Sequence, residues 1–203
     1  MAVEYTNRTG QTYYLLAGKT KTGKPRYFFS ATPEGKGEPV DLVPEGFEVH
    51  ENPRDARVFL RKKRPQLISE EEKALVEKHV NKLKRSHRYL VDCRDANITI
   101  YESNADVDLL KESFSEFFKA NPLRAGLNLE KSLETFIQGA SQYYTEMMQF
   151  RLVDKERRLF IAERFCFRGS IDDWIEIDGP DKLKTLVKRY IKKLGTDDFF
   201  ELY

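Results

Sequence analysis

The stretch AGKTKTGKPRYFF, residues 17–29, decides the class of fold. Gly18, Gly23 and Lys24 have the spacing of a phosphate-binding loop, which would indicate a strand leading into a helix and a parallel α/β sheet. In that motif the residue after the lysine is Ser or Thr, and its hydroxyl holds a magnesium ion. Here that residue is Pro25, which has neither a hydroxyl nor an N–H group. The stretch therefore does not predict a nucleotide-binding loop.

A β-hairpin accounts for the same residues. Thr12–Gly18 and Pro25–Ala31 are rich in β-forming residues, and Lys19–Lys24 connects them. Gly23 supplies the unusual backbone angles that such a connection needs. The expected tip of this hairpin is basic, with four positive charges close together on a short loop. These residues are Lys19, Lys21, Lys24 and Arg26.

The segment that follows the hairpin has room only for short strands. Proline and glycine recur between residues 33 and 53, where they favour turns. The β-forming runs Phe47–Glu51 and Arg57–Lys62 predict a second hairpin. Residues 1–65 are therefore expected to form a small antiparallel β module that Pro65 closes.

Residues 66–203 alternate hairpins with helices and lack the regular strand–helix–strand pattern of a parallel sheet. Helices are expected from the capping box at Ser69 to about Arg85, over Asp106–Ala120, from about Asn128, and from Pro180. Hairpins are expected over Arg88–Cys93 with Ile98–Glu102 and over Tyr144–Val153 with Arg158–Arg168. The sequence predicts an α+β fold, in which the small β module precedes a larger α+β domain with antiparallel hairpins and about four helices.

The composition excludes several classes of protein. The 203 residues contain no run of about 18 apolar residues, which a membrane helix needs. The N-terminus has no basic region followed by an apolar one, so no signal peptide is expected. Cys93 and Cys166 form no C-x-x-C motif and are expected to be reduced core thiols. The histidines have no metal-ligand spacing, and no motif indicates a cofactor. We expect a cytoplasmic protein without a membrane segment.

Positive charge is concentrated in the N-terminal half. Residues 1–94 carry 19 Lys and Arg against 13 Asp and Glu, whereas residues 95–203 carry 16 against 20. A second basic run ends the last strand of the β module, and aromatic residues lie between the basic ones. This pattern is typical of a surface for nucleic acid or an acidic protein, although a solvated strand end accounts for it too. The second run is Arg61, Lys62, Lys63 and Arg64.

The hairpin over residues 144–168 suggests an alternative function. If Val153 pairs with Arg158, Glu146 and Glu163 become diagonal neighbours on a largely apolar face, with Cβ atoms about 7 Å apart. Two such carboxylates need a cation, a shared proton or an arginine. A metal site or a general acid–base pair would have this form, so an enzyme that uses both residues is the alternative to a binding protein. A slip of one residue in the pairing would separate them.

The acidic and aromatic C-terminal segment, residues 197–203, has two interpretations. Its aromatic side chains either dock into a partner or complete the core of the domain. The sequence pattern is compatible with both.

Overall fold

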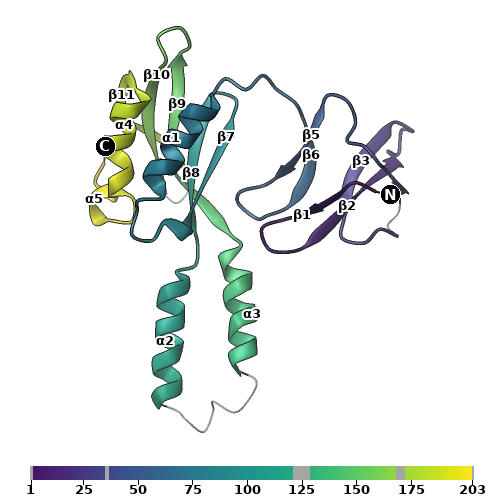
Figure 1. The fold of residues 1–203 in the computed structure, drawn as a ribbon, viewed down its shortest axis with the longest axis horizontal. Coiled ribbons are helices and arrows are strands. Elements are labelled where there is room, and N and C mark those ends of the chain that lie inside the picture. Colours follow the sequence, from purple (N-terminus) through teal and green to yellow (C-terminus); the bar gives the residue numbers. More distant parts are fainter. Residues whose placement is uncertain (1, 35–36, 121–128, 168–171, 203) are drawn as a thin grey trace. The chain divides into compact units, whose positions relative to one another are not determined.

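The computed structural model describes residues 2–34, 37–120, 129–167 and 172–202, and it has an α+β fold with antiparallel sheets (Figure 1). The prediction of an α+β fold with an N-terminal sheet module is confirmed. The chain divides into two compact units. Unit 1 contains Met1–Arg64 and Ala105–Tyr143, and unit 2 contains Pro65–Asn104 and Tyr144–Tyr203. None of the helices in the described ranges is long and apolar enough to cross a membrane.

The first sheet of unit 1 is built around the hairpin predicted from residues 12–31. Strand β2 (Thr12–Lys19) pairs with β3 (Pro25–Ser30) along one edge. Strands β1 (Glu4–Thr6) and β4 (Glu38–Pro39) pair with the other edge of β2. Gly23 has a φ of +79° in the connecting loop, as the hairpin interpretation expects. The near match to a phosphate-binding loop is thus a β–β connection that does not open into a helix.

The second hairpin of unit 1 consists of β5 (Phe47–Glu51) and β6 (Val58–Lys62). Polar contacts join it to the first sheet: the Arg8 guanidinium lies 2.7 Å from a carboxylate oxygen of Glu51, and the Asn7 amide donates to the Ala56 carbonyl at 2.9 Å. Strand β6 also packs against β3. The two basic stretches of the sequence therefore lie in one compact unit.

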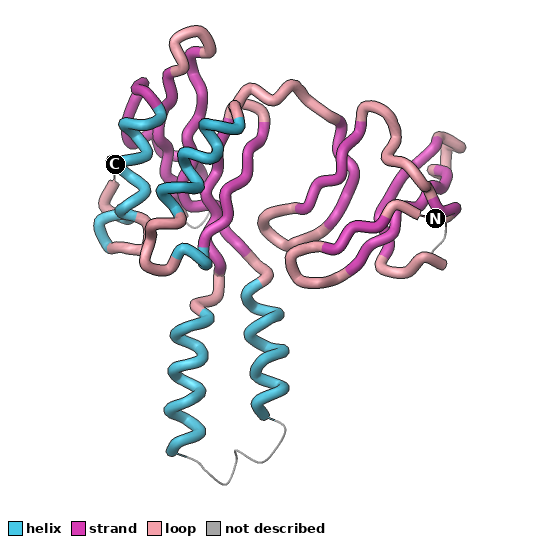
Figure 2. The backbone as a smooth tube through the Cα atoms, viewed as in Figure 1, coloured by secondary structure: helices cyan, strands magenta, loops and turns pink. Residues whose placement is uncertain are grey.

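Unit 1 also contains the two central helices, α2 (Val107–Ala120) and α3 (Leu129–Ser141), which contact one another. Figure 2 shows them as a pair of helices that are consecutive in the chain. Both were predicted from apolar residues at helical spacing. The backbone carbonyl of Gln142, just after α3, accepts a hydrogen bond of 2.8 Å from Arg8.

Unit 2 is a five-stranded antiparallel sheet in the order β11-β10-β9-β8-β7, with helices α1 (Glu70–Val80) and α4 (Leu183–Tyr190) packed on one face (Figure 1). Alternate residues of each strand point to this face, which explains the apolar periodicity of two in the sequence. The strands are β7 (Tyr89–Arg94), β8 (Asn97–Ser103), β9 (Tyr144–Asp154), β10 (Leu159–Cys166) and β11 (Asp173–Lys182). The buried core includes Val76, Ile98, Ile100, Met148, Phe150, Phe160, Leu186, Val187 and Phe199.

Helix α1 begins at the predicted capping box. The Ser69 hydroxyl accepts from the Glu72 N–H at 3.3 Å, and the Glu72 carboxylate accepts from the Ser69 N–H at 2.9 Å. The same carboxylate pairs with Arg158, which ties the helix to the β9–β10 hairpin. The helix ends at Val80 rather than near Arg85, because after the C-cap residue Asn81 the N–H groups of Lys82 and Leu83 bond three residues back instead of four and tighten the chain into turns.

The start of the last long helix differs from the prediction. Pro180 lies within β11, and α4 begins three residues later with Lys182 as its N-cap residue. Pairing with β10 extends the strand, since Leu159 lies opposite Lys182 and Phe160 opposite Asp181. Tertiary pairing therefore overrides the local preference of proline for the first turn of a helix.

Asp178 links β11 to α4. Its carboxylate accepts a hydrogen bond of 2.9 Å from the Tyr190 hydroxyl and forms an ion pair with Arg189. Burial alone would raise the pKa of Asp178, but the hydrogen bonds from Tyr190 and Arg189 outweigh it and lower the pKa below its ordinary value of 3.8. The charged form is therefore the one that stabilises the folded unit.

We expect Asp178→Asn to lower the free energy of unfolding by about 1 kcal/mol at neutral pH. Because the folded-state pKa is below the unfolded one, this contribution is present above the ordinary value of 3.8 and is lost as the pH falls through the lowered value. Urea unfolding followed by the fluorescence of Trp174, the single tryptophan, measures it. The difference from the wild-type protein should shrink on acidification from neutral pH to about pH 3. A difference independent of pH would contradict this role of the carboxylate.

Candidate nucleic-acid interface

The tip of the β2–β3 hairpin is a fixed loop with exposed basic side chains. Two backbone hydrogen bonds of 2.9 Å close it, from the Thr20 N–H to the Lys24 carbonyl and from the Gly23 N–H to the Thr20 carbonyl. Lys19, Lys21 and Lys24 are all exposed. Within the described residues, none of their three ammonium groups has a hydrogen-bond or ion-pair partner. The tip thus presents positive charge that the described part of the chain does not neutralise.

Aromatic side chains accompany the charge on both faces of this hairpin. The Arg26 guanidinium lies over the Phe28 ring, 5.7 Å from its centroid. Tyr27 projects from the opposite face of the strand, as alternation requires, and is 38% exposed. A stacking surface therefore lies beside the lysines of the tip.

The second basic run divides between two roles. Arg61 forms an ion pair with Glu48 at 2.6 Å, so its charge is used within the β5–β6 hairpin. Lys62 lies opposite Phe47 and points to the other face of that hairpin. Lys62, Lys63 and Arg64 are exposed. The packing of β6 against β3 places this run in the same unit as the hairpin tip.

The carboxylates of the β9–β10 hairpin do not form the predicted pairing. Glu163 lies opposite Gln149 rather than Met148, because the turn keeps Leu159 opposite Asp154 and a β-bulge shifts the register at Phe160. Glu146 lies opposite Tyr101 of β8. The register expected from the sequence is wrong by one residue, which moves Glu163 away from the face that the helices cover.

Glu163 is instead the buried partner of an arginine. It is 6% exposed, accepts from the Gln149 amide at 2.7 Å and pairs with Arg151 at 2.9 Å. The hydrogen bond from Arg151 to Glu163 raises the pKa of the arginine. In the part of the chain that is described, no group of three His, Cys, Asp or Glu residues could hold a metal ion. The site resembles a structural ion pair more than a pair of catalytic carboxylates.

Arg164 occupies the helix-covered face where Glu163 was expected. It is 5% exposed and donates a hydrogen bond of 3.1 Å to the Leu202 carbonyl. The charged residue buried on this face is therefore an arginine that holds the C-terminal segment.

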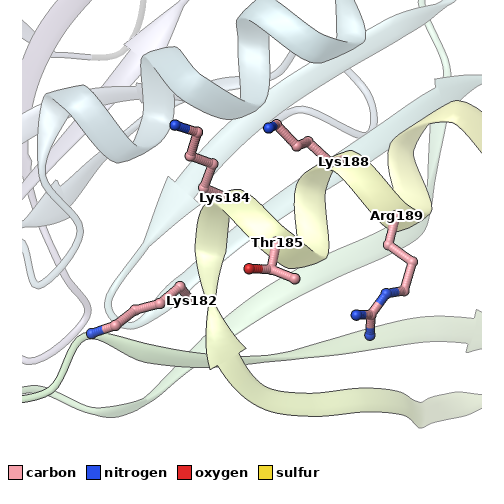
Figure 3. Close-up of a pocket in the computed structure, with 5 residues that line it drawn as sticks. All are labelled: Lys182, Lys184, Thr185, Lys188 and Arg189. Atoms are coloured by element: carbon pink, nitrogen blue, oxygen red, sulfur yellow. The ribbon is translucent and has the colours of Figure 1, made fainter.

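A basic surface that sequence reasoning missed lies along α4. Residues 182–193 contain six Lys or Arg and no Asp or Glu. The apolar residues between them, such as Leu186 and Val187, are buried in the core. The basic side chains line a shallow surface hollow of about 600 Å³. Figure 3 shows these side chains projecting from α4 and from the end of β11. The residues that line the hollow are Lys182, Lys184, Thr185, Lys188 and Arg189. The sequence signal that could have revealed this surface is the absence of acidic residues between the apolar positions of residues 182–193.

Comparison with known proteins adds no function to this geometry. No protein family, curated protein or solved structure matches the chain.

Proposed function

We propose that the chain is a non-catalytic nucleic-acid-binding protein of the cytoplasm, whose unit 1 contacts phosphate groups through the β2–β3 hairpin tip. The observation that carries this proposal is the set of three exposed lysines without partners among the described residues, at Lys19, Lys21 and Lys24. Binding of a nucleic-acid backbone to such a tip is favourable, because each neutralised phosphate releases condensed counterions.

The neighbouring residues favour a nucleic-acid strand over an acidic protein. Tyr27 and Phe59 are 38% and 42% exposed, and an aromatic ring of this kind can stack on an unpaired base. Lysine is depleted at the centre of protein–protein interfaces, whereas lysine contacts to phosphates are common in nucleic-acid complexes. Arg26, Lys62, Lys63 and Arg64 extend the proposed contact surface, with Arg61 held at its edge by Glu48.

Charge reversal of the tip is expected to weaken binding strongly. We predict that Lys19→Glu, Lys21→Glu and Lys24→Glu together reduce affinity for labelled single-stranded DNA at about 50 mM salt by at least about 100-fold, since three attractive contacts become repulsive. Fluorescence anisotropy over a salt series, with single-stranded DNA, duplex DNA and RNA, measures this. Tighter binding of the single strands would support stacking on the aromatic residues.

The control removes the same charge elsewhere. Lys111, Lys119 and Lys155 are exposed, and changing them to Glu alters the net charge of the chain equally. The proposal requires that this control loses much less affinity than the tip variant. It fails if both variants behave alike or if the wild-type chain binds no nucleic acid. Binding of the tip lysines to poly-glutamate instead would indicate an acidic protein as the partner.

A further inference from the structure

Three lysines form a row along the last long helix of unit 2. Lys184, Lys188 and Lys192 are spaced by four residues, which places neighbouring side chains on one side of a helix about 6 Å apart. Figure 3 shows Lys184 and Lys188 pointing to the same side of α4. The third residue, Lys192, lies in the 3-10 turn Ile191–Lys193 that continues the helix. We call these three residues the α4 lysine row.

The charge of the α4 lysine row is not neutralised by the residues around it. All three lysines are exposed, and within the described ranges their ammonium groups have no hydrogen-bond or ion-pair partner. Asp178, on the neighbouring strand, is already paired with Arg189. Lys182 donates to the Arg157 carbonyl and so is also engaged. Among the described residues, the row is therefore an unpaired part of the basic surface.

The first turn of α4 adds to this positive potential. It has no acidic residue, and the N-cap residue Lys182 makes no side-chain capping bond. The N-terminal end of a helix carries a partial positive charge, which the basic residues here increase rather than offset. A bound anion would relieve this repulsion, and the surface hollow beside Lys184, Thr185 and Lys188 gives one room to approach.

The composition of the surface distinguishes between the classes of polyanion. An interfacial membrane helix needs an exposed apolar face, but the apolar residues of α4 (Leu183, Leu186, Val187 and Tyr190) are buried. A protein partner would need aromatic or aliphatic anchors at the centre of its interface, where lysine is depleted. A phosphodiester backbone needs only positive charge that follows the strand.

We infer that the α4 lysine row is a second phosphate-contacting surface, which binds the backbone of a nucleic-acid strand. It lies in unit 2 and requires no contribution from the hairpin tip in unit 1. The chain then holds two separate contacts for nucleic acid, each of which adds to the affinity and to its dependence on salt.

The salt dependence of binding tests this inference directly. We expect Lys184→Gln, Lys188→Gln and Lys192→Gln together to reduce the slope of log K against log salt by about 2 for oligo(dT) and by about 3 for a duplex. The affinity of the full chain at about 50 mM salt should fall about tenfold or more. The matched control changes Lys111, Lys119 and Lys155 to Gln. Neither variant should lose thermal stability, because all six side chains are exposed.

The outcomes separate this inference from the proposed function. A row variant that keeps the wild-type slope, as the control does, overturns the inference even if the tip variant no longer binds. If the row variant loses affinity and the tip variant does not, the inference stands and the proposed role of unit 1 is wrong. Row-dependent binding to phosphatidylserine vesicles, without binding to nucleic acid, also overturns the inference.

Discussion

Replacement of Gly179 by alanine is expected to lower the free energy of unfolding by about 3 kcal/mol or more. Gly179 has a φ of +120°, a conformation that residues with a Cβ atom rarely adopt. A Cβ atom added there would lie 2.7 Å from the Phe160 carbonyl oxygen and 2.8 Å from the Ile161 Cα. Both are backbone atoms of the adjacent strand, so a change of rotamer cannot remove the overlap. Strand β10 must move away from β11, next to the core residue Phe160.

Gly195 provides a matched control in the same unit. It also has a positive φ, of +75°, but among the described residues an added Cβ would meet only the Tyr89 hydroxyl, at 2.9 Å. This atom is the end of a flexible side chain and can move, so Gly195→Ala should cost about 1 to 2 kcal/mol from backbone strain. Urea unfolding followed by Trp174 fluorescence compares the two variants. Equal losses in the free energy of unfolding would show that the close approach of β10 to Gly179 adds nothing to the cost of the substitution.

The same region explains why the sequence predicted the strands but not their register. The hairpins were predictable, because β-forming runs are separated by short polar turns. The register of β9 and β10 depends on a bulge at Phe160 and on Arg158, whose φ is +51°. An arginine carries no sequence signal for a positive φ. A slip of one residue exchanges the two faces of a strand, so it was sufficient to misplace Glu163 and the proposed carboxylate pair.

The basic surfaces were only partly predictable for a related reason. The lysines of the hairpin tip were identifiable, because a loop between two strands is exposed whatever the rest of the fold does. Which charges are free depends on partners that only the three-dimensional structure brings together. Glu48 neutralises Arg61, whereas Asp178 engages Arg189, and no described residue pairs with Lys184 or Lys188. The sequence gives the number of charges, and the tertiary structure determines which of them are available to a ligand.

The second large expected effect is a loss of stability when the C-terminal segment is altered. This segment forms the short helix α5 (Asp197–Phe200). The sequence left open whether its aromatic residues dock into a partner or complete the core. Phe199 is fully buried in the core of unit 2, and the Leu202 carbonyl that follows accepts the hydrogen bond from buried Arg164. We predict that Phe199→Ala lowers the free energy of unfolding by about 3 to 5 kcal/mol, since it leaves a cavity where a whole ring was packed.

The adjacent Phe200 is a control with the same chemistry and almost the same position in the chain. It is 54% exposed, and its ring makes an edge-to-face contact with that of Phe199, with ring centroids 5.4 Å apart. Phe200→Ala should therefore cost about 1 kcal/mol or less. Urea unfolding of both variants, again followed by Trp174 fluorescence, gives the comparison. If the segment served only to dock a partner, both substitutions would leave the stability of the isolated chain almost unchanged, whereas a core role requires the loss at Phe199 to be several times larger.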